Sequence, residues 1–124
     1  MTPLPAIRAI NRSAAGLTVE FELDPGHVVF DGHFPGLPIL PAVVQIGWAV
    51  AMASQHFALP EATRALRALK FLRVVQPPVP LRLELEHDGS TGSVSFAYFQ
   101  GGTACSTGRI EFADDASRPG RSFL

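Results

Sequence analysis

The sequence predicts an α+β fold in which one long buried helix is wrapped by a curved antiparallel sheet of about five to six strands. Two features of the sequence lead to this expectation. Several segments alternate apolar and polar residues with a period of two and are separated by short turn sequences, as in half-buried antiparallel strands. One further segment has the length of a helix and contains no Asp, Glu, Lys or Arg from position 32 to position 60, as in a buried helix.

The N-terminal part is expected to form a hairpin. Apolar residues occupy every second position from Leu17 to Leu23, which is typical of a half-buried strand. Residues 6–12 are its expected partner strand, and the turn between the two falls at residues 13–16.

The helix is expected over residues 41–57. Pro41 suits the first turn, where a missing N–H costs little, and the helix should end before Pro60. The segment FDGHFPGLPILP that leads into it is too rich in Gly and Pro for regular structure. Because the helix has no charged face, it must be buried by the sheet that wraps it or by a partner subunit.

Four further strands are expected downstream, over residues 68–75, 81–87, 93–99 and 103–112. The dipeptides Asp88-Gly89 and Gly101-Gly102 supply two of the turns, and the PPVP sequence at residues 77–80 is expected to interrupt the ladder. Residues 1–113 should form a single domain, and residues 114–124 a loose C-terminal tail.

Composition and charge exclude several function classes. The net charge of -1, without a cluster of basic residues, does not fit a nucleic-acid partner. The longest apolar segment is too short for a membrane span, and the N-terminus has no signal-peptide pattern. The single cysteine, Cys105, rules out an internal disulfide and is expected in the core rather than as a nucleophile. We therefore expect a soluble, cytoplasmic protein with no metal cluster and no cofactor.

The segment from Phe30 to Trp48 brings together the residue types that acyl-thioester chemistry needs. His33 lies in a loop stiffened by proline, and this loop leads into the N-terminus of an apolar helix. The free N–H groups of a helix N-terminus carry a partial positive charge. A base, an oxyanion donor and an apolar surface are thus expected in one place, as removal of the α-proton of a thioester requires.

The sequence GHFPGLPILPAVVQIGWA, residues 32–49, resembles the signature of the hotdog-fold 3-hydroxyacyl-[acyl-carrier-protein] dehydratases, GHFPG-x-P-x-x-PGV. It looks closest to the dehydratase-like branch of aryl polyene and related pigment lipid pathways, and a weaker resemblance extends through most of the chain. The resemblance implies a hotdog fold and dehydration of 3-hydroxyacyl thioesters in fatty acid or polyene-type lipid synthesis. It also implies a homodimer or higher homo-oligomer, in which the histidine of one chain faces the acid of the other.

Residue by residue, the resemblance implies that His33 is the catalytic base. It also implies that the backbone N–H of Ala42, at the glycine position of PGV, binds the thioester carbonyl. The family's acidic residue lies fourteen positions after the histidine, where this chain has Gly47. The other expected substrate-binding residues are Phe34, Gly36, Pro41, Gln45 and Trp48.

Gly47 leaves the function open between two classes. A positioned general acid contributes roughly 10²–10⁴ in rate, and glycine has no proton to give. The chain is therefore either a dehydratase with weak or altered activity or a catalytically degenerate acyl-binding or assembly subunit that pairs with an active homologue. A hotdog thioesterase is a lesser alternative, because it would need a carboxylate near the helix. The substrate is an acyl thioester on a carrier protein or on coenzyme A.

Other polar and apolar residues near the motif have ordinary structural interpretations. Asp31 is expected to bond to backbone N–H groups in a turn, and His56 to act as a cation at the end of the helix. His27 and His87 are expected to be solvated. Some residues are compatible with an acyl tunnel or with ordinary core: Trp48, Phe71 and Met52. Others are compatible with carrier-protein docking, although solvated surface charge is the favoured interpretation: Arg64, Arg67, Lys70 and Arg73.

Overall fold

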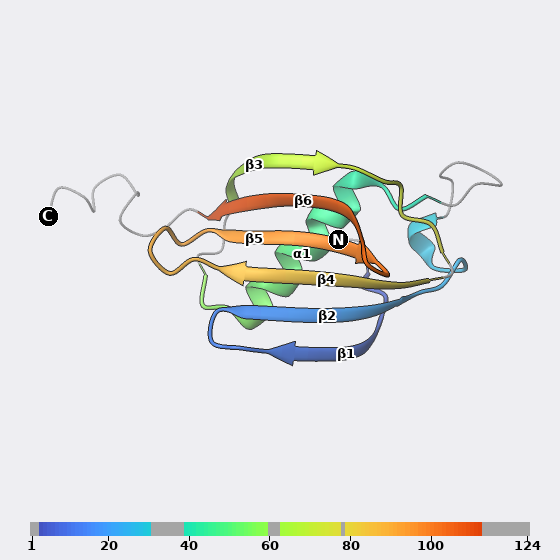
Figure 1. Cartoon of the computed structure of the whole chain (residues 1–124), viewed down its shortest axis with the longest axis horizontal. Coiled ribbons are helices and arrows are strands. Elements are labelled where there is room, and N and C mark those ends of the chain that lie inside the picture. The colour runs from blue at the N-terminus through green and yellow to red at the C-terminus, as the bar shows by residue number, and fades with distance from the viewer. Residues whose placement is uncertain (1–2, 31–38, 60–62, 78, 113–124) are drawn as a thin grey trace, which may run out of the picture.

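The computed structural model describes residues 3–30, 39–59, 63–77 and 79–112. These residues form six β-strands and one α-helix of 15 residues. The helix crosses one face of the sheet (Figure 1). The expected architecture of one long helix against a single antiparallel sheet is confirmed.

The order of elements is β1 (Ala6–Arg12), β2 (Gly16–Leu23), the 3-10 turn η1 (Val28–Phe30), α1 (Ala42–His56), β3 (Thr63–Phe71), β4 (Val79–His87), β5 (Val94–Gln100) and β6 (Thr103–Phe112). The strand order in the sheet is β1-β2-β4-β5-β6-β3, and every neighbouring pair is antiparallel. The strand that follows the helix, β3, therefore lies at one edge, and β1 lies at the other.

The N-terminal hairpin is confirmed. The strand β1 pairs with β2 from Ala6 opposite Glu22 to Arg12 opposite Leu17. In the turn, the Ser13 N–H donates to the Gly16 carbonyl at 3.0 Å, and the Gly16 N–H donates to the Ser13 hydroxyl at 3.1 Å.

The prediction for the strand after the helix is wrong by several residues. The expected strand covered residues 68–75, whereas β3 runs from Thr63 to Phe71. As an edge strand it pairs with β6 and is exposed over most of its length. It therefore lacks the alternation that marks a half-buried strand, and the apolar residues beyond it drew the prediction toward the C-terminus.

The expected interruption at residues 77–80 is also misplaced. Pro80 lies within β4 and pairs with Glu22 of β2. On the other side of β4, pairing with β5 begins only at Arg82. Proline is tolerated here because the start of the strand has a neighbour on one side, so its missing N–H removes no bond to β5.

The core lies between α1 and the concave face of the sheet. Trp48, which is fully buried, packs from α1 against Phe21 of β2 with ring centroids 6.0 Å apart. Tyr98 of β5 and Met52 of α1 are also fully buried. Other core residues are Leu17, Val19, Leu23, Leu81, Leu83, Leu85, Val94, Phe96 and Ile110.

The helix is buried on one face rather than all round. Gln45, Trp48 and Met52 face the sheet, but Val43 on the opposite side is 74% exposed. The single chain therefore leaves an apolar helix face open to solvent. The expectation that a partner subunit covers this face stays a prediction.

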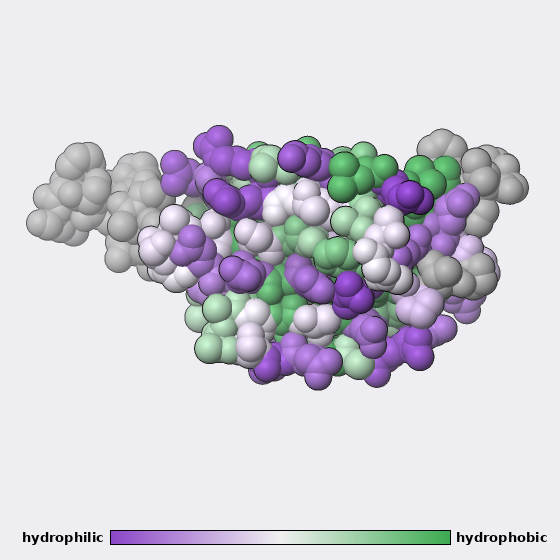
Figure 2. Space-filling view, viewed as in Figure 1, coloured by the Kyte–Doolittle hydropathy of each residue, from purple (hydrophilic) through white to green (hydrophobic). Residues whose placement is uncertain are grey.

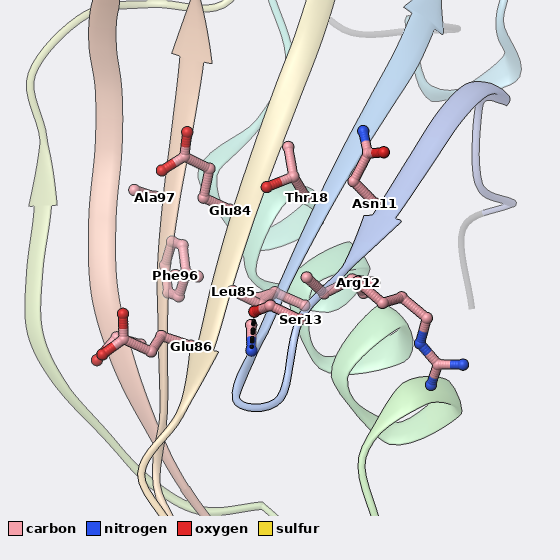
Figure 3. A pocket seen from close by; sticks show the side chains of 12 residues that line it. Asn11, Arg12, Ser13, Thr18, Glu84, Leu85, Glu86, Phe96 and Ala97 are labelled. Atoms are coloured by element: carbon pink, nitrogen blue, oxygen red, sulfur yellow. Dashed lines mark hydrogen bonds between the residues drawn. The ribbon is translucent and has the colours of Figure 1, made fainter.

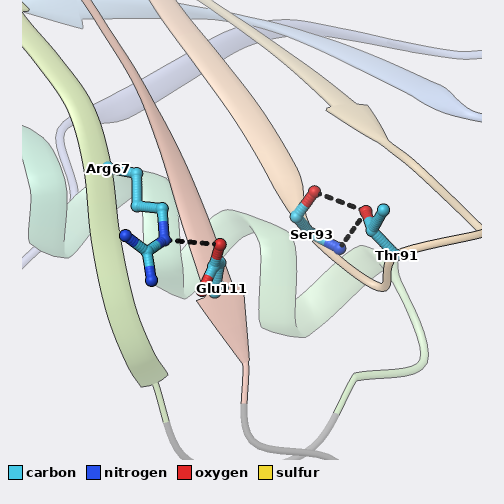
Figure 4. A network of polar contacts seen from close by, with 4 residues as sticks. All are labelled: Arg67, Thr91, Ser93 and Glu111. Carbon is cyan, nitrogen blue, oxygen red and sulfur yellow. Dashed lines mark hydrogen bonds and ion pairs between the residues drawn. The ribbon is translucent and has the colours of Figure 1, made fainter.

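The convex face of the sheet is polar. Arg67 of β3 forms an ion pair with Glu111 of β6 at 2.7 Å (Figure 4). Arg82 forms one with Glu84 at 2.9 Å and stacks its guanidinium over the Phe99 ring. This face has the character of a solvated surface.

Candidate functional site

The N-terminus of α1 presents two backbone N–H groups that have no acceptor among the described residues. Pro41 precedes the helix with φ -63° and ψ 147°, and its carbonyl accepts the N–H groups of Val44 and Gln45, both at 3.1 Å. Within the described residues, the N–H groups of Ala42 and Val43 have no acceptor. Such orphan donors at a helix N-terminus attract a negatively charged or polarised oxygen.

A pocket of about 440 Å³ lies beside Ala42. One wall is the start of α1 with the residues before it, and the other is the end of β3 with the segment that follows. The lining is mainly apolar, as an acyl chain requires. Its residues are Ile39, Leu40, Pro41, Ala42, Gln45, Phe71, Leu72, Arg73 and Val74.

Both walls of the pocket are tied to the sheet by backbone hydrogen bonds. The Leu40 N–H donates to the Val75 carbonyl at 2.8 Å, which joins the two walls. The N–H groups of Leu72 and Arg73 both donate to the Cys105 carbonyl of β6, at 2.8 and 3.1 Å. The pocket is thus built on fixed backbone rather than on side chains alone.

Gln45 is buried, and each end of its amide forms a hydrogen bond. Its Nε2 donates to the Leu40 carbonyl at 3.1 Å, and its Oε1 accepts from the Ser106 hydroxyl at 2.7 Å. The Tyr98 hydroxyl donates to the Gln45 backbone carbonyl at 2.7 Å. Burial raises the pKa of Tyr98 well above its ordinary value, so this hydroxyl remains a donor.

Sequence reasoning missed Tyr98 and Ser106 as partners of Gln45. A signal for them exists, because a polar residue in a helix without charges needs buried partners. Ser106 in β6 and Tyr98 in β5 lie directly opposite each other in the sheet, so both reach the same turn of α1.

The expected site residues fall into three groups. His33, Phe34, Gly36 and Asp31 lie outside the described residues. Pro41, Ala42 and Gln45 line the pocket, and Phe71 lines it as well. Trp48 and Met52 are fully buried core residues and are not part of the pocket wall.

Gly47 lies beside open space. A Cβ built on Gly47 would have no described atom within 4 Å. The first carbon of a side chain at this position would therefore meet no steric obstacle within the described part of the chain.

Two of the histidine predictions are wrong. The ring of His27 packs edge-on against Trp48 at 5.7 Å, and its Nδ1 accepts the Val29 N–H at 3.0 Å, so it is not simply solvated. His87 packs against Phe57 with ring centroids 5.2 Å apart.

At the C-terminal end of α1, a different cation takes the place expected for His56. The Arg12 guanidinium donates to the His56 carbonyl at 3.0 Å. Partial burial and the neighbouring Arg12 charge lower the pKa of His56. Cys105 is a core residue as expected, 1% exposed, and burial raises the pKa of its thiol.

A second pocket, of about 430 Å³, is a weaker candidate. It lies on the sheet near the turn between β1 and β2, on the strands' polar side (Figure 3). Thr18, Glu84 and Ala97 form a cross-strand row there, with Glu86 beside them. Two carboxylates and few apolar side chains suit neither an acyl chain nor a developing oxyanion.

The described residues contain neither a metal site nor a membrane-spanning helix. No three His, Cys, Asp or Glu side chains in this part of the chain lie close enough together to hold a metal ion. Among the described helices, none is long and apolar enough to cross a bilayer.

Solved structures share this fold. The chain is similar to the dehydratase heterocomplex ApeI:P from Xenorhabdus doucetiae, with 27% identity and a TM-score of 0.83, over 89% of this chain and 98% of that one. It is also similar to an uncharacterized protein from Erwinia carotovora subsp. atroseptica, with 27% identity and a TM-score of 0.75, over 93% and 100%.

A more distant similarity shows the fold alone. The dehydratase domain of PpsC from Mycobacterium tuberculosis, solved in complex with C12:1-CoA, matches with 19% identity and a TM-score of 0.67, over 90% of this chain and 43% of that one. The helix and sheet described above are thus those of the hotdog-fold dehydratases.

The family assignment comes from the sequence itself. The family model described as "ApeI-like: ApeI dehydratase" matches residues 9–109, which include the whole of α1 and the four complete strands β2 to β5. The chain therefore belongs to the ApeI-like dehydratase family.

Proposed function

We propose that the chain binds a 3-hydroxyacyl thioester, carried by an acyl carrier protein or by coenzyme A, in the pocket at the N-terminus of α1. The observation that carries this proposal is the Ala42 N–H, which has no acceptor among the described residues and belongs to the lining of a mainly apolar pocket of about 440 Å³. The thioester oxygen gains negative charge when the α-proton leaves. A fixed N–H donor at a helix N-terminus stabilises that charge.

His33 is assigned the role of base in this proposal. It occupies the histidine position of the family signature, six residues before Ile39, where the described chain enters the pocket wall. In the dehydration, the base takes the α-proton, a carbon–carbon double bond forms, and the hydroxyl group leaves the β-carbon as water after it gains a proton.

The last proton is the step that Gly47 weakens. Without a positioned acid we expect the dehydration rate to fall by roughly 10²–10⁴ relative to a complete site. The activity of the chain is therefore proposed to be weak, in a pathway of fatty acid or polyene-type lipid synthesis.

A homodimer is part of the proposal. Hydrophobic side chains are exposed along β3 and the segment after it: Leu66, Leu69, Phe71, Leu72 and Val74. Figure 2 shows such a gathering toward the C-terminal end of β3. This free edge and the exposed apolar face of α1 are liabilities in a monomer, and a second copy would cover both.

A second candidate is a degenerate subunit that pairs with an active homologue. The absence of an acidic side chain at Gly47 favours it, and one structure that this chain resembles is the ApeI:P heterocomplex. In such a pair the homologue would supply the acid that faces His33 of this chain. The thioesterase alternative is disfavoured because α1 has no carboxylate.

The test is to restore the acid. Gly47→Asp should raise the rate of 3-hydroxyacyl-pantetheine dehydration at least about tenfold, followed by the absorbance of the enoyl thioester. Gly47→Asn is the matched control, because it has nearly the same shape and no proton to transfer, and it should give no gain. His33→Ala should abolish the rate gained in Gly47→Asp.

Two results would contradict the proposal. Equal gains from Asp and Asn would mean that the effect at position 47 is structural rather than acidic. A failure of the unmodified chain to bind any acyl thioester would reject the pocket itself. Turnover only after addition of an acid-bearing homologue would favour the second candidate.

A further inference from the structure

We propose that Gln45 is a positioning residue that aims the Ala42 N–H into the pocket; this inference rests on the proposed function. Although Gln45 borders the pocket, it is 3% exposed, and both ends of its amide are bonded to protein atoms. Because it is almost fully buried, we assign it a role through the groups that it holds rather than through direct contact with substrate.

The direction of the Ala42 N–H follows from the planarity of the peptide group. The Pro41 carbonyl and the Ala42 N–H belong to one trans peptide, so they point in opposite directions. The Pro41 carbonyl is turned into the helix, where it accepts the N–H groups of Val44 and Gln45. The Ala42 N–H must then point out of the helix at its N-terminus, and Ala42 is one of the residues that line the pocket.

Gln45 fixes the next peptide group upstream. Its Nε2 binds the Leu40 carbonyl, while the Leu40 N–H is held by Val75. The Pro41 ring limits rotation about φ between the Leu40–Pro41 peptide and the Pro41–Ala42 peptide. With Leu40 held on both sides, the peptide that carries the Ala42 N–H has little freedom left.

Ser106 of β6 fixes the Gln45 side chain to the sheet. The Ser106 hydroxyl donates to Oε1, which orients the amide so that its NH₂ group faces Leu40. An apolar side chain would fill the same space without this bond. A buried polar group without partners costs about 1–3 kcal/mol, so the amide needs both bonds to be buried here without loss of stability.

Tyr98 provides a matched control. Its hydroxyl also bonds to Gln45, but to the backbone carbonyl, which has no link to Leu40. Tyr98→Phe removes one buried hydrogen bond at the same helix turn and leaves the bond from Gln45 Nε2 to the Leu40 carbonyl intact. A general loss of stability and a loss of positioning can therefore be separated.

The experiment compares Gln45→Met with Tyr98→Phe in two measurements. The first is the NMR order parameter of the Ala42 N–H in the ligand-free chain, which should fall in Gln45→Met and stay unchanged in Tyr98→Phe. The second is the isotope-edited infrared carbonyl band of a bound acyl-pantetheine thioester. Gln45→Met should lose most of the downshift seen with the parent chain, while its affinity changes by less than about threefold.

Gln45→Glu is a second variant with a distinct signature. A protonated carboxyl can donate to the Leu40 carbonyl and accept from Ser106, whereas an ionised carboxylate cannot donate. The carbonyl downshift should therefore return as the pH falls, relative to the parent chain at the same pH. A merely space-filling role would give no such recovery.

The outcomes are distinguishable. Unchanged Ala42 order and an unchanged carbonyl band in Gln45→Met would overturn the inference, and so would an equal loss in Tyr98→Phe. If the parent chain binds no acyl thioester, the proposed function fails, and the order parameter of Ala42 still decides whether Gln45 holds it.

Discussion

Gly47 weakens α1 without any compensating contact in the described part of the chain. Glycine in a helix interior is less stable than alanine by about 1 kcal/mol. A Cβ at this position would meet no described atom within 4 Å. We therefore expect Gly47→Ala to raise the free energy of unfolding by about 1 kcal/mol, measured by urea denaturation at low protein concentration. A loss of stability that appears only at high concentration would show that a partner subunit packs against Gly47.

His56 makes the stability depend on pH in one direction. Partial burial and the Arg12 charge hold its pKa below the ordinary value of 6.5, so the unfolded chain binds the proton more tightly. Stability should therefore fall as the pH drops through the ordinary pKa of histidine. His56→Gln should reduce the change in the urea denaturation midpoint between about pH 7.5 and pH 5.5. An identical pH profile in parent and variant would contradict the role of His56.

The motif of residues 32–49 predicts a candidate site at the N-terminus of α1, but it does not predict the contacts that hold this helix end in place. The motif includes Gln45, but its bonding partners Tyr98 and Ser106 lie 53 and 61 positions further along the chain. Only the sheet register brings them to the helix. The cation expected at the end of α1 was His56, whereas the structure has Arg12. Arg12 could not be predicted there because it lies 44 positions from His56 in the sequence.

Among the elements, β3 departs most from expectation and carries a local irregularity. Ala68 has a φ of 54°, and the pairing with β6 shifts register between Arg67 and Lys70. A residue with a Cβ is less stable in this left-handed region by roughly 1–2 kcal/mol. We expect Ala68→Gly to stabilise the chain by up to about 1 kcal/mol, once the greater flexibility of glycine is included. Thermal unfolding measures this change in stability. A destabilised variant would contradict the left-handed backbone conformation of Ala68.

The contact between β3 and the centre of the sheet depends on Gly108. A Cβ on Gly108 of β6 would lie 2.6 Å from Leu69 Cδ2 and 2.6 Å from the Phe96 ring. Gly108→Ala should therefore destabilise the chain by about 1–3 kcal/mol through overpacking. Gly89→Ala is the control, since a Cβ there meets no described atom within 4 Å, and it should change stability little. Equal effects of the two substitutions would show that Leu69 and Phe96 move aside freely.

The strands with a clear inside and outside were predicted within one or two residues, because alternation reports burial on one face. The strands β2 and β5 are examples. An edge strand such as β3 has no such pattern, and its true start at Thr63 could not be read from periodicity.

For the whole molecule, the exposed apolar surface calls for a partner. Leu66 and Leu69 on β3 are 40% and 36% exposed, and Val43 on α1 is 74% exposed. We expect sedimentation equilibrium to show at least a dimer. Leu66→Glu should weaken the dimer, whereas Thr63→Glu at the start of β3 should not. A monomeric parent chain at micromolar concentration would contradict the proposed assembly.

The central claim is that the Ala42 N–H at the start of α1 binds the thioester oxygen of an acyl substrate. Titration of the ¹⁵N-labelled chain with a 3-hydroxyacyl-pantetheine thioester tests it most directly. We expect the Ala42 amide proton to move downfield and saturate, together with the residues that line the α1 pocket. Shifts confined to Thr18 and Ser95 on the polar face of the sheet, or no shift at Ala42, would contradict it.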